Sequence, residues 1–290
     1  MLMHSTPDHQ VLQQKLATLR AILRAMESVA IGYSGGVDST LLLKVAVDEL
    51  GERAVAMIGR SETYPTREFE EAMTLANAIG ARTVVVPTEE TDIVKFRENP
   101  ADRCYFCKTE LFGKLHAVAR AENLRWVADG SIIDDAGDFR PGTRARTEAE
   151  VRSPLLEAAL SKAEVRELSR TLGLPTWDKP AFACLSSRFP YGTAITREHL
   201  ARVDRAEALL QASGFRACRV RFHDERTARI EVPAEDMVRL LEPGTREHLV
   251  AGLKELGFTY VTLDLQGYRT GSMNEVLSEQ TKRRFSGGDG

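Results

Sequence analysis

Three of the four cysteines lie in segments whose residue types suit chemistry better than packing. Cys104 and Cys107 belong to the stretch DRCYFCK, and their spacing lets one short loop present two thiolates to a single metal. Cys184 is followed closely by two serines and by Arg188, an unusual composition for a core segment. The Arg188 guanidinium would favour a thiolate at Cys184. These three cysteines are therefore candidate ligands or reactive groups.

The fourth cysteine, Cys218, has a different setting. It opens the stretch CRVRFH, where strand alternation places it on one face with Val220 and Phe222, so we expect it in the core. Three remaining thiols suit a metal or cluster that keeps one open position. A [4Fe–4S] cluster, a zinc ion with a fourth ligand and an unligated pair of partly buried thiols all fit the spacing. Whether Cys184 reaches the pair is open at this point.

A glycine-rich loop lies upstream, between the apolar stretch SVAIGY and the helical pattern TLLLKVAVDEL. Glycine lets the backbone approach a ligand closely, and the start of a helix offers free N–H groups to an anion. Asp38 would repel a phosphate unless Mg²⁺ bridged the two, so we predict that Asp38 binds Mg²⁺. The loop lacks the Gly-Lys-Ser/Thr of a Walker motif, and a tight turn that only caps the helix is the alternative interpretation. The predicted phosphate-binding residues are Ser34, Gly35, Gly36, Val37, Asp38 and Ser39.

Two further polar segments are candidates for binding. Asp129 and Gly130 come at the end of a predicted strand, where metal or nucleotide contacts are common, although surface turn chemistry would produce the same pattern. Arg219 and Arg221 share one face of a later strand and could donate to an anion with carboxylate or phosphate groups. The alternative for these arginines is the solvated face of a half-buried strand.

The elements that must position these residues alternate regularly in the first part of the chain. Strands are predicted at 28–33, 53–59, 81–87 and 125–131, with helices at 40–50, 66–80 and 108–124 between them. This order is typical of an α/β fold with a doubly wound parallel sheet, whose ligands bind at the carboxyl ends of the strands. A capping box at Ser161 and Glu164 predicts another helix start.

The pattern changes after residue 193. A helix is predicted over about 196–213, and strands follow at 218–223, 228–232 and 258–265. We predict a pyrophosphate-loop ATP-binding domain with the cysteine site over 1–193, and a smaller α+β domain for substrate binding or oligomerisation over 194–273. A disordered tail is expected over 274–290.

Composition narrows the class of protein. The 290 residues carry a formal net charge of −3, which argues against broad nucleic-acid binding. No apolar run approaches the roughly 18 residues that span a bilayer, and the first residues lack the apolar core of a signal peptide. We expect a cytoplasmic enzyme with reduced thiols and no nucleic-acid or membrane partner.

The SGGVDS loop resembles the signature of the N-type ATP pyrophosphatases, which release pyrophosphate from ATP and pass AMP to an acceptor oxygen. Together with NPADRCYFCK, DGSIIDDAGDFRPGTRA and KPAFACLSSRFPYGTAIT, it resembles the LarE family of ATP-dependent sulfur transferases of nickel-pincer nucleotide biosynthesis. The resemblance extends over nearly the whole chain, to about Met273. The last two stretches are far more specific than the loop.

The resemblance implies a reaction. ATP and Mg²⁺ would adenylylate one carboxylate of pyridinium-3,5-biscarboxylic acid mononucleotide, and sulfur would displace AMP to give a thiocarboxylate. The second carboxylate would follow, on the way to the nickel cofactor of lactate racemase. Cys184, Asp38 and Arg188 would be catalytic. Arg219 and Arg221 would bind the substrate phosphate. The resemblance implies less strongly that Glu207 also binds the substrate.

The family has two sulfur chemistries. Single-cysteine members sacrifice the sulfur of the residue that matches Cys184, whereas three-cysteine members use a [4Fe–4S] cluster fed by sulfide or another sulfur donor. Because both Cys104 and Cys107 are present, we predict the cluster type, held by Cys104, Cys107 and Cys184. The alternatives are a sacrificial Cys184, a tRNA thiolase and a nucleotide-binding sensor without activity. The family also implies a homo-oligomer, such as a hexamer.

Overall fold

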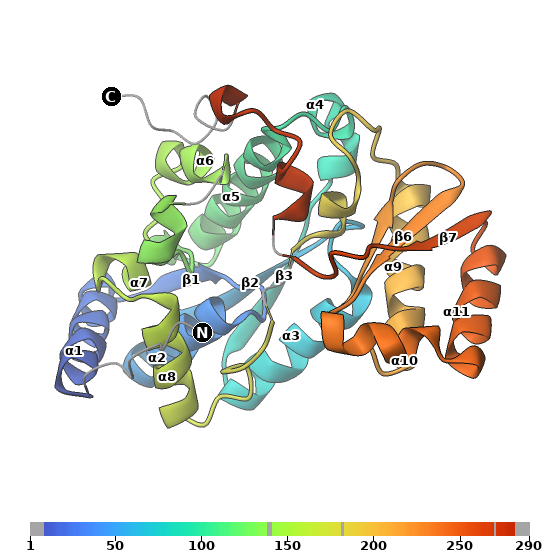
Figure 1. The fold of residues 1–290 in the computed structure, drawn as a ribbon. Coiled ribbons are helices and arrows are strands. Elements are labelled where there is room, and N and C mark those ends of the chain that lie inside the picture. Colours follow the sequence, from blue (N-terminus) through green and yellow to red (C-terminus); the bar gives the residue numbers. More distant parts are fainter. Residues whose placement is uncertain (1–8, 138–140, 181–182, 270, 282–290) are drawn as a thin grey trace.

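The computed structural model describes residues 9–137, 141–180, 183–269 and 271–281 (Figure 1). Parts of two stretches that carry the family resemblance, at 138–140 and 181–182, lie outside the described residues, as do residues 282–290 of the expected tail. Whether that tail is disordered stays a prediction. Among the described residues, Asn274 of the expected tail accepts a hydrogen bond from the hydroxyl of Tyr191 at 2.9 Å.

The first sheet has four parallel strands in the order β3-β2-β1-β4, which confirms the predicted α/β class. Val29 pairs with Ala54 on one side and with Trp126 on the other, so β1 lies between β2 and β4. The chain therefore adds strands on one side of β1 and then returns to its other side. Their bounds are β1 Val29–Gly32, β2 Ala54–Arg60, β3 Arg82–Pro87 and β4 Trp126–Ala128.

Helices cover both faces of this sheet. Alternate residues of each strand point to opposite faces, so each face has its own apolar cluster. Val29 and Ile31 pack in one apolar cluster, whereas Ala30 between them packs in another. The first cluster includes residues from α1 His9–Met26, α2 Val37–Leu50, α3 Thr66–Ile79, α7 Pro154–Glu157 and α8 Lys162–Thr171. The second includes residues from α5 Arg103–Ala121 and α6 Gly142–Glu148.

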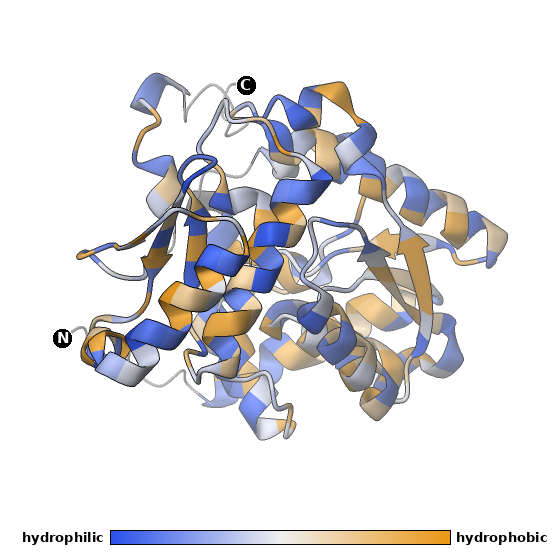
Figure 2. Ribbon diagram, turned by 90° about the vertical axis from the view of Figure 1, so that its right-hand side faces the viewer, coloured by the Kyte–Doolittle hydropathy of each residue, from blue (hydrophilic) through white to orange (hydrophobic). Residues whose placement is uncertain are grey.

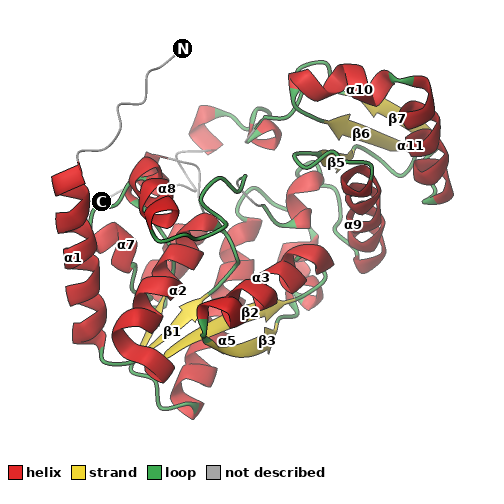
Figure 3. Ribbon diagram, turned by 90° about the horizontal axis from the view of Figure 1, so that it is seen from below, coloured by secondary structure: helices red, strands yellow, loops and turns green. Residues whose placement is uncertain are grey.

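A second sheet of three strands lies to one side of the first (Figures 1 and 3). Strand β5 pairs antiparallel with β6, and β6 pairs parallel with β7. Its core cluster also contains Phe96 of α4 Val94–Arg97, together with Leu185 and Phe189. Residues before 194 therefore help to build this core, and the boundary after 193 stays a prediction. The elements are β5 Arg219–Phe222, β6 Thr227–Glu231, β7 Tyr260–Leu263, α9 Arg197–Ala212, α10 Met237–Leu241 and α11 Pro243–Glu255.

Hydrophobic and hydrophilic residues alternate along the helices (Figure 2). In α1, for example, Leu12, Leu16, Leu19 and Leu23 are buried at helical spacing. Within the described residues, no helix combines the length and the apolar character needed to cross a membrane.

Candidate active site

The glycine-rich loop joins β1 to α2 at the carboxyl end of the parallel sheet. Gly35 has a φ of +63°, and a side chain there would place its Cβ 2.8 Å from Cβ of Ala72 in α3. The positive φ and the close contact with Ala72 both require glycine at this position. Gly36 is the N-cap of α2 and has no side chain with which to bond the first N–H groups of the helix. The helix start is therefore suited to receive an anion.

The end of β4 packs directly against this loop. A Cβ on Gly130 would lie 3.0 Å from the backbone nitrogen of Ser39, so only glycine allows the approach. The carboxylate of Asp129 accepts hydrogen bonds from the hydroxyls of Ser131 at 2.8 Å and Ser153 at 2.7 Å. Gly130 thus packs against the loop, while Asp129 holds the turn that carries it; nucleotide binding by these two residues stays a prediction. This place between β1 and β4 is the point where the strand order reverses and where such sheets bind ligands.

Lys162 is a further candidate residue that the sequence patterns did not single out. Its Nζ lies 2.6 and 2.8 Å from the two carboxylate oxygens of Asp38, the predicted Mg²⁺ ligand. The capping box at Ser161 and Glu164 is present, so Lys162 occupies the first position of α8. That box predicts a helix start, but no local pattern places the start beside β1.

The two neighbouring cysteines lie on a helix, not in the short loop expected from their spacing. Helix α5 begins at Arg103, and it carries Cys104 and Cys107 in its first two turns. Residues three apart share one side of a helix, so the spacing still presents both sulfurs in one direction. Both are partly exposed, whereas Cys218 is fully buried in the second core, as predicted.

Cys184 comes close to this pair. Burial raises the pKa of Cys107 well above its usual value, and negative charge on Glu90, Cys184 and Cys104 raises that pKa further. The pKa of Tyr191 is also raised by burial and by charge on Cys104 and Cys184. The fold therefore brings together cysteines that the sequence could not place relative to one another.

Three thiols whose charges influence one another are donors of the type that a thiolate-binding group requires. The nearby side chain of Glu90 is buried, and its Oε2 has no hydrogen-bond partner. Across the described residues, however, no three His, Cys, Asp or Glu side chains are grouped closely enough to hold a metal ion. Joint binding of a cluster by the three cysteines thus stays a prediction.

That Arg188 favours a thiolate at Cys184 stays a prediction, and the structure gives Arg188 further partners. It is 1 % exposed and forms a two-bond ion pair with Glu207 of α9, at 2.8 and 2.7 Å. Its Nη1 donates to the carbonyl oxygens of Ala183 and Cys184 at 2.7 and 3.0 Å. Glu207 also accepts from the backbone nitrogen of Val220 at 3.0 Å. The pair fixes the backbone of residues 183–188, the Cys184 segment, against α9 and β5.

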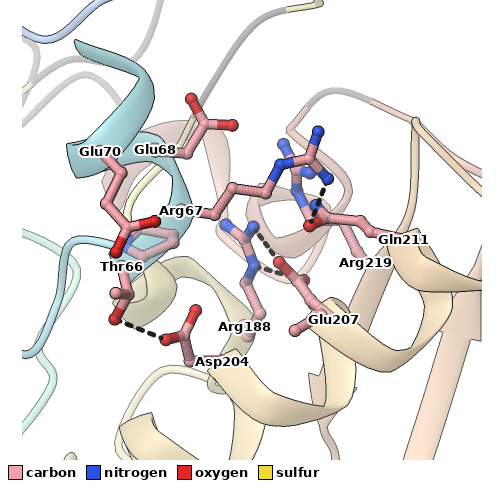
Figure 4. Close-up of a pocket in the computed structure, with 11 residues that line it drawn as sticks. Thr66, Arg67, Glu68, Glu70, Arg188, Asp204, Glu207, Gln211 and Arg219 are labelled. Atoms are coloured by element: carbon pink, nitrogen blue, oxygen red, sulfur yellow. Dashed lines mark hydrogen bonds and ion pairs between the residues drawn. The ribbon is translucent and has the colours of Figure 1, made fainter. Parts of the chain in front are cut away.

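A cavity of about 220 Å³ lies between α3 and α9. Figure 4 shows Arg188 and Arg219 near each other at this cavity, with the Arg188–Glu207 pair between α9 and the Cys184 segment. Asp204 also lines it, and burial raises the pKa of Asp204. Burial, with the positive charges of Arg188 and Arg221, lowers the pKa of Arg219. The cavity is thus lined by both arginines and carboxylates, the latter including Glu68 and Glu70.

A parallel sheet with a glycine-rich loop, a carboxylate and a lysine at its switch point defines the class: an ATP-using enzyme with a pyrophosphate loop. In agreement, the sequence profile of the family described as NAD synthase matches residues 10–119.

Full-length relatives narrow the class to a family. The chain is 40 % identical over 276 residues, 95 % of this chain and 99 % of the relative, to pyridinium-3,5-bisthiocarboxylic acid mononucleotide synthase of Lactiplantibacillus plantarum. It is 46 % identical over 269 residues, 93 % of this chain and 100 % of the relative, to the uncharacterised protein slr1717 of Synechocystis sp.. The uncharacterised protein MJ0830 of Methanocaldococcus jannaschii is 29 % identical over 84 % of this chain and 92 % of its own length. The chain belongs to the LarE family, and it is an ATP-using sulfurtransferase.

Proposed function

We propose that this enzyme adenylylates the carboxylates of pyridinium-3,5-biscarboxylic acid mononucleotide and converts them to thiocarboxylates. The printed name of the Lactiplantibacillus plantarum relative supports the identity of the product. The proposal is supported by a glycine-rich loop at the start of α2 in a chain that also carries Cys104 and Cys107 on α5 and Cys184 beside a short 3₁₀ helix. The loop would bind ATP, and the cysteines would provide the sulfur.

In the first half-reaction, a substrate carboxylate oxygen attacks the α-phosphorus of ATP and pyrophosphate leaves. The N–H groups at the start of α2 and the loop hydroxyls hold the phosphates, and Asp38 holds Mg²⁺. Asp129 and Gly130 complete the nucleotide site, with Gly130 packed on Ser39. Lys162 pairs with Asp38, and its cation would be available to the phosphates if Mg²⁺ bound Asp38.

In the second half-reaction, sulfide attacks the acyl-adenylate carbon and AMP leaves, so the thiocarboxylate retains one substrate oxygen. A [4Fe–4S] cluster bound by Cys104, Cys107 and Cys184 would supply the sulfur atom. Arg219 faces the cavity and binds the phosphate of the mononucleotide. Arg188 and Glu207 position the Cys184 segment at the edge of that cavity.

The test uses anaerobically purified enzyme with the mononucleotide, ATP, Mg²⁺ and sulfide. We expect pyrophosphate, AMP and a thiocarboxylate product by mass spectrometry, with iron and sulfide bound to the protein. Release of ADP and orthophosphate would exclude adenylylation. Loss of about 34 Da from Cys184, as its thiol becomes dehydroalanine, would instead assign a sacrificial sulfur donor.

A further inference from the structure

The segment that carries Cys184 has little structure of its own to hold it in place. Cys184 is the N-cap of a four-residue 3₁₀ helix, Leu185–Arg188. Such short helices are weak by themselves, so their position is set by contacts with the rest of the protein. On one side, the backbone nitrogen of Leu185 donates to the carbonyl oxygen of Thr63 at 2.8 Å, just beyond β2.

The other side of the segment is held by two buried arginines. Arg188 reaches the carbonyl oxygens at its beginning, as described above. Arg221 of β5 donates from Nη1 to the carbonyl oxygen of Ser187 at 3.0 Å, near its end. The segment is thus tied to α9 by the pair between its own Arg188 and Glu207, and to β5 near its end by Arg221.

Arg221 is itself fixed by a buried partner. Its Nε and Nη2 bond the two carboxylate oxygens of Glu231 on β6, at 2.9 and 2.7 Å, and Nη2 also donates to the hydroxyl of Ser272 at 2.9 Å. The side chains of Arg221 and Glu231 are 6 % and 0 % exposed. A planar guanidinium paired in this way has a fixed orientation, so its remaining N–H groups can hold a backbone carbonyl firmly.

Arg219 and Arg221 are therefore unlike each other, although they lie two residues apart on one strand. Arg219 lines the cavity, whereas Arg221 is not among the described residues that line it. Arg219 donates to the carbonyl oxygen of Cys218 at 2.8 Å and to the hydroxyl of Tyr268 at 3.0 Å. The donors of Arg221 are instead directed to Glu231, Ser272 and Ser187, in a buried two-bond ion pair away from the cavity.

We propose that Arg221 is a positioning residue: together with Glu231 it holds the Ser187 carbonyl, and with it the Cys184 segment, where sulfur transfer requires it. Arg219 alone of the two binds the substrate. This inference rests on the proposed function for its kinetic consequence, but its structural part can be measured without that function.

The test compares three variants. In the double variant Arg221→Met with Glu231→Gln, the buried charges are removed together, so no unpaired charge remains to unfold the second sheet. Arg221→Lys keeps a positive charge beside Glu231 but cannot form the two-bond pair and also hold the Ser187 carbonyl. Arg229→Met is the matched control, because Arg229 also contacts Glu231, at 3.2 Å, and lies on the next strand.

We expect the double variant to lose about 10²-fold in kcat for thiocarboxylate formation, as displacement of a reacting group by about 1 Å does. Its KM for the mononucleotide and its rate of pyrophosphate release should stay within twofold. Iodoacetamide should alkylate Cys184 severalfold faster than in the wild type, with Cys107 unchanged. Arg221→Lys should show the same pattern with smaller changes, and Arg229→Met should show none of it.

A raised KM with unchanged kcat, in either Arg221 variant, would make Arg221 a substrate ligand and overturn the proposal. Unchanged alkylation of Cys184 in the folded double variant would also overturn it. If the wild-type enzyme does not act on the mononucleotide, the proposed function fails, and the alkylation rates still decide whether Arg221 holds the segment.

Discussion

The loop that follows β1 and the site around Cys184 differ in how they are built. The loop is one continuous segment between a strand and a helix, and its shape follows from Gly35, from the helix start and from the close approach of Gly130. The cysteine site takes Cys104 and Cys107 from the first turns of α5 and Cys184 from a short 3₁₀ segment. Contacts with Glu207 of α9 and Arg221 of β5 hold that segment.

In the proposed function, the two half-reactions would depend on different parts of the fold. Adenylylation would use the edge of the parallel sheet, where backbone geometry shapes the loop. Sulfur transfer would use the contacts of Arg188, Glu207 and Arg221 that hold the Cys184 segment. Variants should therefore separate the two half-reactions cleanly, and the following predictions test that separation.

The largest effect is expected at Asp38. Asp38→Ala removes the proposed Mg²⁺ ligand, so substrate-dependent pyrophosphate release should fall by about 10³-fold. Sulfur transfer should fall equally, because it needs the adenylate. Asp48→Ala is the matched control, since Asp48 lies on the same helix and pairs with Lys44 at the surface. Pyrophosphate release that survives in Asp38→Ala would remove the loop from the reaction.

The three site cysteines should show the opposite separation. Cys104→Ala, Cys107→Ala and Cys184→Ala are each expected to lose bound iron and thiocarboxylate formation, while pyrophosphate release remains. Iron analysis, optical absorbance and product mass spectrometry measure these outcomes. If Cys104→Ala keeps full sulfur transfer, the cluster proposal is wrong and Cys184 acts alone.

A variant of Lys162 tests how this residue acts at the loop. Lys162→Ala should lower pyrophosphate release by about 10²-fold, because the phosphates lose a cation. The same change should tighten Mg²⁺ binding in the absence of nucleotide, since Lys162 no longer pairs with Asp38. Calorimetry with Mg²⁺ alone measures the second effect. Weaker Mg²⁺ binding would mean that Lys162 supports Asp38 instead of competing for it.

A variant of Arg219 tests whether the cavity binds the mononucleotide. Arg219→Ala should raise the KM for the mononucleotide by about 10- to 100-fold, the effect of losing one charge-assisted hydrogen bond. The affinity for ATP should not change, because the loop lies on the other sheet. Steady-state kinetics with each substrate varied in turn decides this, and an unchanged KM for the mononucleotide would place its phosphate elsewhere.

The smallest functional effect is expected at Cys218. Burial raises the pKa of its thiol to about 12, so at pH 8 it remains protonated and should resist iodoacetamide in the folded protein. Because the thiolate is the reactive form, its alkylation should increase only as the pH rises toward that value. Cys218→Ala should lower the free energy of unfolding by about 1–2 kcal/mol and leave both half-reactions within twofold. Any marked loss of sulfur transfer would show that the second core does more than support the site.

Much of this protein can be predicted from the sequence, because local patterns decide it. The alternation of strands and helices predicts the four-stranded parallel sheet, which the structure confirms. The glycines and the acidic residue of the loop predict a nucleotide site, and the capping box predicts the start of α8. Strand alternation also predicts that Cys218 is buried. Each of these conclusions depends on residues that are neighbours in the chain.

The tertiary structure decides which of these segments meet. Nothing local in the sequence brings Lys162 to Asp38, brings Cys184 near Cys107 or distinguishes Arg221 from Arg219. Strand alternation puts both arginines on one face, but only the packing of β5 against β6 and the Cys184 segment commits Arg221 to Glu231 and Ser187. The physical reason is that a side chain's type and period set which way it points, while its partners come from whichever distant segment the fold packs against it.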